Sequence, residues 1–167
     1  MITRRGRVVS AVAAIIGIAL ISAIAWVFVH PTIRAVLDNG EVTYANDSQA
    51  WIFGNDGWFG AITLVGGFLL SGAFLATTRW RNLPVVAIAL GTVAMTVYAL
   101  MTWLFGMSLD DLIHHGVSPF PPEHLAAGDS AVDRLQLRAY GVMGVPVITW
   151  TVMVTFDAIF SNRKSSG

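Results

Sequence analysis

The 167-residue sequence contains no cysteine, which excludes disulfides, thiolate metal sites, covalently attached c-type haem and iron–sulfur clusters. Charged residues are scarce as well: they make up 12% of the chain, about half of what soluble domains carry. Hydrophobic residues make up 55%, and the mean hydropathy is +0.67. This composition excludes an ordinary soluble domain and predicts a single integral membrane domain over residues 1–167.

Four apolar windows are each long enough to cross about 30 Å of hydrocarbon as a helix. They cover about residues 8–29, 58–78, 84–105 and 140–160. We therefore predict an all-α integral membrane protein whose four transmembrane helices form two hairpins. Long outer loops are expected at about residues 31–57 and 106–138.

The first window resembles a secretory signal peptide, because Arg4 and Arg5 precede an apolar run. The run continues to Val29, however, which is the length of a full span. We expect it to be retained as a helix. His30-Pro31 should end this helix, since proline disfavours helical geometry in the residue before it.

Turn and cap residues predict further boundaries. Asn39-Gly40, between stretches rich in β-branched residues, indicates a small hairpin in the first outer loop. Ser130 followed by Asp133 fits a capping box, so we expect a helix to begin there and to run into the fourth span. Pro146 would kink that helix, because its ring clashes with the preceding turn.

Basic residues gather on one side of the predicted bundle. Seven of the ten lie at the termini or in the short connection between spans two and three: Arg4, Arg5, Arg7, Arg79, Arg81, Arg163 and Lys164. Nine of the ten acidic residues lie in the two long connections. The positive-inside rule therefore predicts a multi-pass protein of the bacterial plasma membrane with both termini cytoplasmic. Basic residues placed in this way set topology, so we expect no nucleic-acid partner.

The histidines offer the main candidates for metal chemistry. They are His30, His114, His115 and His124. All lie at or beyond the outer membrane edge, so no span supplies an axial ligand for a haem in the bundle core. Asp111 and His115 would share a face at helical spacing, and zinc or copper could be considered there. The spacing matches no strong metal signature, so we predict a solvated acidic loop; the weaker alternative is a site built from His114, His115, His124 and Asp111.

Asp157 is the only charged residue predicted within a span. Intramembrane carboxylates raise the hypothesis of a proton path. Asp157 nevertheless lies one turn from the cytoplasmic end, near Arg163 and Lys164, so we favour an interfacial ion pair. The other polar residues of the spans can bond to backbone carbonyls; they are Ser71, Thr92, Thr96, Thr149 and Thr151.

Aromatic and hydroxyl residues give no catalytic pattern. Tryptophans cluster near the outer boundary, where interfacial anchoring would explain them; these are Trp26, Trp51, Trp58 and Trp103. No Gly-x-Ser-x-Gly elbow or phosphate-binding loop occurs. We therefore predict that the protein is not an enzyme and carries no cofactor.

The segment Trp51–Gly60, the arginine-rich start and the four-span layout resemble small four-helix membrane proteins of actinobacteria, mostly of unknown function. Some proteins of similar size and layout are accessory subunits of the cytochrome bcc–aa3 respiratory supercomplex. The resemblance implies a cofactor-free protein that binds at the edge of a larger assembly. It carries over no functional residues.

These observations favour a non-catalytic accessory or scaffolding subunit of a bacterial inner-membrane complex, with other integral membrane subunits and lipids as partners. The expected partner contacts are Trp51, Phe53 and Phe120 in the outer loops, and Gly67, Ser71 and Gly72 in the second span. The small residues could equally hold only the protein's own bundle together. Two alternatives are a small transporter or channel that uses Asp157, and an extracytoplasmic metal-binding protein.

Overall fold

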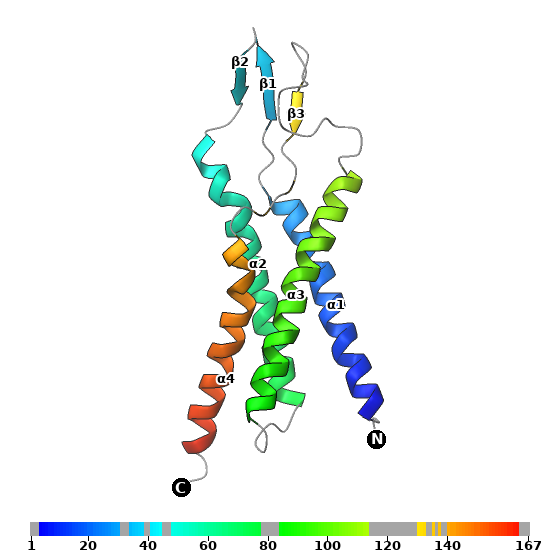
Figure 1. Cartoon of the computed structure of the whole chain (residues 1–167), viewed down its shortest axis with the longest axis vertical. Coiled ribbons are helices and arrows are strands. Elements are labelled where there is room, and N and C mark those ends of the chain that lie inside the picture. Colours follow the sequence, from blue (N-terminus) through cyan, green and yellow to red (C-terminus); the bar gives the residue numbers. More distant parts are fainter. Residues whose placement is uncertain are drawn as a thin grey trace.

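The computed structural model describes residues 4–30, 34–38, 41–44, 48–77, 84–113, 130–132, 135, 137 and 140–163. Its four long helices are α1 (Arg4–Val29), α2 (Ser48–Thr77), α3 (Pro84–Ile113) and α4 (Val145–Arg163). Each is long and apolar enough to cross a membrane, which confirms the four predicted spans. The first residue of α1 and the last of α4 lie at the same end of the bundle (Figure 1).

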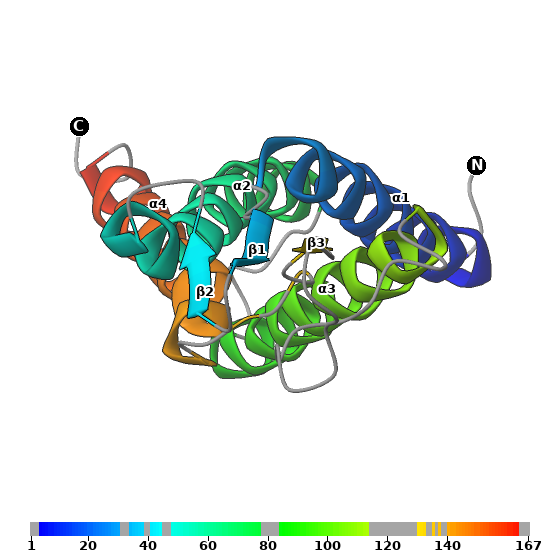
Figure 2. The same ribbon diagram turned by 90° about the horizontal axis from the view of Figure 1, so that it is seen from above.

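The helices form a ring in which the closest pairs are not consecutive in sequence. α1 packs most extensively against α3, and α2 against α4, while contacts of α3 with α4 and of α1 with α2 close the ring (Figure 2). α2 and α3 are joined by residues 78–83 and run antiparallel, yet they contact each other least among these pairs. The short connection predicted adjacent helices, whereas packing places α2 and α3 across the ring.

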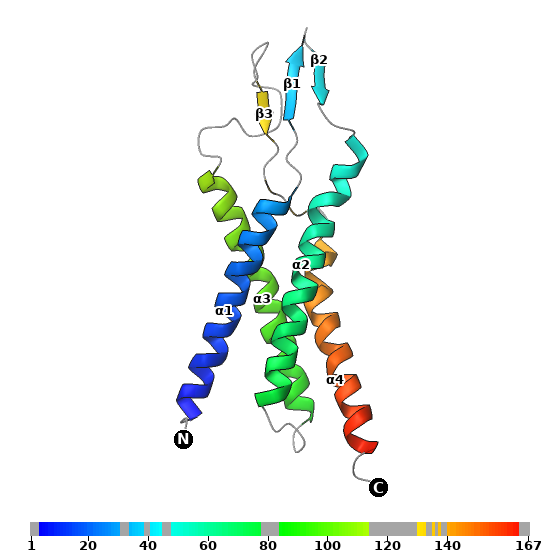
Figure 3. The same ribbon diagram turned by 180° about the vertical axis from the view of Figure 1, so that it is seen from behind.

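A small sheet caps the end of the bundle opposite the two termini (Figures 1 and 3). Its strands are β1 (Arg34–Asp38), β2 (Glu41–Tyr44) and β3 (Ser130–Val132), in the antiparallel order β2-β1-β3. Asp38 pairs with Glu41 across residues 39–40, so the predicted hairpin is confirmed. The spanning part is all-helical, and the sheet is an addition to the predicted architecture.

The helix predicted to start at Ser130 is wrong. Ser130 begins β3, which pairs with β1 through Val36 and Ser130, because the free edge of the hairpin satisfies its backbone groups better than a local cap does. A 3₁₀ helix, η3 (Tyr140–Gly144), then leads into α4. Pro146 is the second residue of α4, directly after this 3₁₀ helix, where its missing N–H removes no α-helical bond; the predicted kink stays a prediction.

Two helices extend beyond their apolar windows. α1 ends at Val29, directly before His30-Pro31, as predicted. α2 begins well before residue 58 and α3 continues past residue 105, so residues 48–57 and 106–113 are helical rather than parts of outer loops. Of the polar residues in these extensions, Asn55, Asp56 and Asp110 are buried, which explains why hydropathy alone misplaced the helix ends.

Large side chains fill the bundle where glycines let helices approach. One core cluster contains Ala19, Leu70, Met95, Tyr98 and Trp150, and the other contains Trp26, Val27, Phe59, Leu135 and Leu137. Gly66 faces Tyr98, Gly91 faces Trp150 and Gly106 faces Trp26. Trp26 is 0% exposed, so the expectation that it anchors the protein at the membrane interface is wrong.

Candidate functional site

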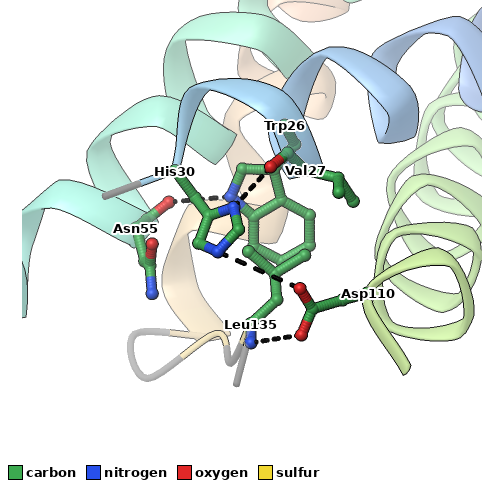
Figure 4. A network of polar contacts seen from close by, with 6 residues as sticks. All are labelled: Trp26, Val27, His30, Asn55, Asp110 and Leu135. Carbon is green, nitrogen blue, oxygen red and sulfur yellow. Dashed lines mark hydrogen bonds and ion pairs between the residues drawn. The ribbon is translucent and has the colours of Figure 1, made fainter. Parts of the chain in front are cut away.

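The sheet end of the bundle contains a cluster of buried polar side chains. His30, Asn55, Asp56 and Asp110 are each 8% exposed or less. Ionisable side chains are rarely buried to this extent unless they are paired. Three of these residues, with Trp26, Val27 and Leu135, form the network of contacts in Figure 4. This cluster is the candidate functional site of the described structure.

His30 is held rigidly at the end of α1. Its backbone N–H donates to the carbonyl of Trp26 at 2.9 Å, and its ring nitrogen Nδ1 lies 2.6 Å from the carbonyl oxygen of Val27. A carbonyl oxygen only accepts hydrogen bonds, so Nδ1 carries the hydrogen. The other nitrogen, Nε2, is buried and has no hydrogen-bond partner among the described residues.

Asp110 faces His30 from the last turns of α3. Its Oδ1 lies 3.9 Å from His30 Nε2, and both side chains are 2% exposed. Its Oδ2 accepts a hydrogen bond of 2.8 Å from the backbone N–H of Leu135. The prediction of a solvated acidic loop is therefore wrong for Asp110, because this carboxylate joins α1, α3 and the segment that precedes α4.

Trp26 connects the same site to α2. Its indole N–H donates to the backbone carbonyl of Asn55 at 3.1 Å, and its ring packs edge-on against Phe59 with centroids 4.8 Å apart. The side-chain oxygen of Asn55 is buried, and no described residue forms a hydrogen bond with it. Four chain segments thus meet at one buried polar centre below the sheet.

The residues singled out from the sequence as metal candidates do not build this centre. Asp111 is exposed, and His114, His115 and His124 lie outside the described residues. Within the described ranges, no group of three or more histidine, aspartate or glutamate side chains could hold a metal ion.

Some of the predicted partner contacts lie within the helix bundle, and others lie outside the residues that the structure describes. Gly67 lies against Pro146 and Thr149 of α4, and Ser71 is fully buried, so the alternative that small residues hold the protein's own bundle together describes both. Gly72 is half-buried and faces open space. The side chains of Trp51 and Phe53, and the whole of Phe120, lie outside the described part.

Asp157 lies in the last turns of α4. Its side chain is exposed and has no hydrogen-bond or ion-pair partner in the part of the chain that the structure describes. The side chains of Arg163 and Lys164, its predicted ion-pair partners, lie outside that part. Asp157 therefore presents a carboxylate on an otherwise apolar span.

Polar side chains in the middle of the bundle are mostly satisfied within it. Ser22 and Tyr98 share a hydrogen bond of 2.8 Å between α1 and α3. Thr96, Thr149 and Thr151 donate to carbonyls one turn earlier, as expected for hydroxyls in a span. These contacts stabilise helix packing and assemble no reactive group.

Sequence reasoning missed the pair of His30 and Asp110. The two residues lie 80 positions apart, since 110 − 30 = 80, and no local spacing connects them. Their position at the ends of two predicted spans could have identified them as a pair. Each is an ionisable residue at the outer end of an apolar helix, and both ends belong to the same side of the predicted bundle.

The four spanning helices define the class of the molecule, a multi-pass membrane protein with a small sheet at one end. No protein-family model, curated protein or solved structure matches this chain.

Proposed function

We propose that the protein is a non-catalytic accessory or scaffolding subunit of a larger complex in the bacterial plasma membrane, where other integral membrane subunits are its partners. The observation that carries this proposal is the exposed carboxylate of Asp157 in the last turns of α4. The resemblance to accessory subunits of the bcc–aa3 supercomplex makes a respiratory assembly the first one to test.

α4 is the least enclosed of the four spans. Only 17% of its apolar window is buried, against 28–33% for the other three, so most of its surface is free to contact lipid or another protein. Its exposed apolar side chains are Ile148, Val152, Phe156 and Ile159. α4 therefore has surface available for a partner helix.

An exposed carboxylate on a spanning helix is costly in lipid. An aspartate at the centre of a transmembrane helix costs about 2.5–3.5 kcal/mol, and less toward the helix ends. A partner helix that places an arginine or lysine beside Asp157 offsets this cost and also fixes the register of the contact. We therefore assign α4 as the docking face, and a basic transmembrane helix of another subunit as its occupant.

The interior of the bundle favours this role over conduction by a single chain. Trp150, Tyr98 and Met95 fill the middle of the bundle and are at most 1% exposed. The buried ionisable residues among those described, His30, Asp56 and Asp110, lie at the sheet end. Asp157 is exposed and lies apart from these residues, in the last turns of α4.

The arrangement of the ends supports the proposed orientation. The start of α1, the end of α4 and the ends of α2 and α3 that residues 78–83 connect all lie opposite the sheet (Figures 1 and 3). These are the places where basic residues gather in the sequence. By the positive-inside rule that end is cytoplasmic, so the sheet and its connecting segments face outward.

Affinity purification of the tagged chain in native lipid, followed by quantitative mass spectrometry, tests the proposal. We expect the same membrane subunits to accompany the wild type and Asp111→Asn, and to fall at least about tenfold with Asp157→Leu, since about 1.4 kcal/mol corresponds to a factor of ten. Asp111→Asn is the matched control because it removes an exposed carboxylate at the opposite end.

Site-specific crosslinking identifies the occupant. A photo-crosslinker at Val152 on α4 should capture a helix with a basic residue, and one at Val9, which is 67% exposed on α1, should not. Migration of the wild type only as a free monomer would overturn the proposal. So would co-purification that is unchanged by Asp157→Leu.

A further inference from the structure

The arrangement of His30 and Asp110 indicates a property that the proposed subunit role does not include. Because Nδ1 of His30 donates to the carbonyl of Val27, a neutral imidazole carries its lone pair on Nε2. That lone pair faces Oδ1 of Asp110 across 3.9 Å. Two electron-pair donors that face each other in a buried site repel unless a proton or a metal cation lies between them.

Both side chains are also supported as metal ligands usually are. A histidine that binds a metal typically donates its other ring N–H to a backbone carbonyl, and a ligating carboxylate is held by a further hydrogen bond. His30 has the first support in the carbonyl of Val27. Asp110 has the second in the N–H of Leu135, which donates to Oδ2, while Oδ1 faces the histidine (Figure 4).

The separation of the two atoms fits a bridging ion. Zinc bonds to histidine nitrogen and carboxylate oxygen are each about 2.0–2.2 Å, so they span about 4.2 Å in a line and about 3.4 Å at a tetrahedral angle. The observed 3.9 Å lies between these limits. A shift of a few tenths of an ångström would bring the pair to tetrahedral geometry.

We propose that His30 Nε2 and Asp110 Oδ1 are the protein ligands of a divalent transition-metal site between α1 and α3, with zinc as the ion that suits them. An imidazole nitrogen beside a single carboxylate favours zinc and similar metals over magnesium or calcium, which prefer sets made only of oxygen ligands. Two protein ligands leave the remaining positions to water or other small donors. The ion would tie the outer end of α1 to α3 and, through Leu135, to the segment that leads into α4.

Zinc titration of the full-length, chelator-treated protein in nanodiscs tests the site. The probe is zinc alone, in competition with a chromophoric chelator. We expect one zinc per wild-type chain and at least about tenfold weaker binding for His30→Gln and for Asp110→Asn, since loss of even a supporting group costs about 10–100-fold in metal affinity. Asp111→Asn, adjacent in sequence but exposed, should bind as the wild type does. Thermal unfolding of each variant in the absence of zinc shows whether the fold is retained.

A second measurement uses the unaltered protein, so the test does not depend on the folding of the variants. X-ray absorption at the zinc edge should show nitrogen and oxygen ligands only, at about 2.0–2.2 Å. Nitrogen NMR should show a shift at His30 Nε2 when zinc is added. Binding that persists in His30→Gln, or that is lost equally in Asp111→Asn, would overturn the proposal. So would a wild type that binds no zinc and carries a proton on Nε2.

Discussion

The indole ring of Trp150 on α4 occupies the space that a side chain on Gly91 of α3 would need. The Trp150 N–H reaches the carbonyl of Ile88 at 3.2 Å, and its ring meets Phe74 of α2 edge-on at 5.7 Å. One tryptophan therefore holds three helices together, and a glycine makes its position possible.

We expect Gly91→Ala to displace Trp150 and to loosen the contact between α3 and α4. Overpacking of this kind costs about 1–3 kcal/mol. Unfolding of the purified protein by increasing SDS in mixed micelles measures the change in the free energy of unfolding. Gly17→Ala and Gly72→Ala are matched controls, because nothing lies within 4 Å of a Cβ at either position. They should leave stability unchanged or raise it by up to about 1 kcal/mol. Equal effects at all three positions would contradict the assignment.

The hydrogen bond between Ser22 and Tyr98 joins α1 to α3 within the span. Tyr98→Phe removes this bond and keeps the ring, so we expect a loss of about 0.6 kcal/mol, and at most about 1.7 kcal/mol, as for other interhelical bonds in membranes. Ser22→Ala and the double variant complete a double-mutant cycle in the same SDS assay. Tyr140→Phe is the control, since Tyr140 is 66% exposed. An interaction energy near zero would show that the bond contributes nothing.

The carboxylate of Asp110 fixes the segment around Leu135. Asp110→Ala leaves the buried N–H of Leu135 without an acceptor, which costs about 1–3 kcal/mol. We expect faster hydrogen exchange at Leu135 and in β3, while exchange in the centre of α3 stays unchanged. Mass-spectrometric hydrogen exchange on peptides that cover residues 130–137 measures this. Asp111→Asn should leave the same peptides protected.

The sequence could predict features that depend on residues close together in the chain, but not features that depend on contacts between distant segments. Hydropathy located the four spans, the His30-Pro31 pair marked the end of α1, and Asn39-Gly40 marked the β1–β2 hairpin. Each of these features is determined by a few neighbouring residues and by the solvent around them. Such features can be predicted from a single chain.

The errors all concern contacts between distant segments. Ser130 carries a local helix signal, but the free edge of β1 captures it as a strand. Tryptophan often anchors a helix at the membrane interface, but the ring of Trp26 lies in the core, where Gly106 of α3 leaves space for it. Asp110 belongs to an acidic stretch that usually contacts water, but Leu135 and His30 bury it. Such contacts bring the helices of the candidate site together, so the sequence alone could not locate it.

The absence of cysteine makes the proposed orientation directly measurable, because every introduced thiol is the only one in the chain. We place one cysteine in the sheet, as Glu41→Cys in β2, and one in the last turn of α4, as Ser161→Cys. In intact spheroplasts, a membrane-impermeant maleimide should label the Glu41→Cys variant. It should label the Ser161→Cys variant only after the membrane is permeabilised.

The physical reason for this expectation is the charge distribution. Seven basic residues lie at the termini or in the α2–α3 connection, and translocating them across the membrane is disfavoured. An even number of spans returns the chain to its starting side, so a thiol at Gly6→Cys should behave as Ser161→Cys does. Reversed labelling of all three sites would overturn the orientation but keep the four spans. Opposite behaviour of the Gly6→Cys and Ser161→Cys variants would instead require an odd number of crossings, and both the bundle in the membrane and the docking face on α4 would then have to be rejected.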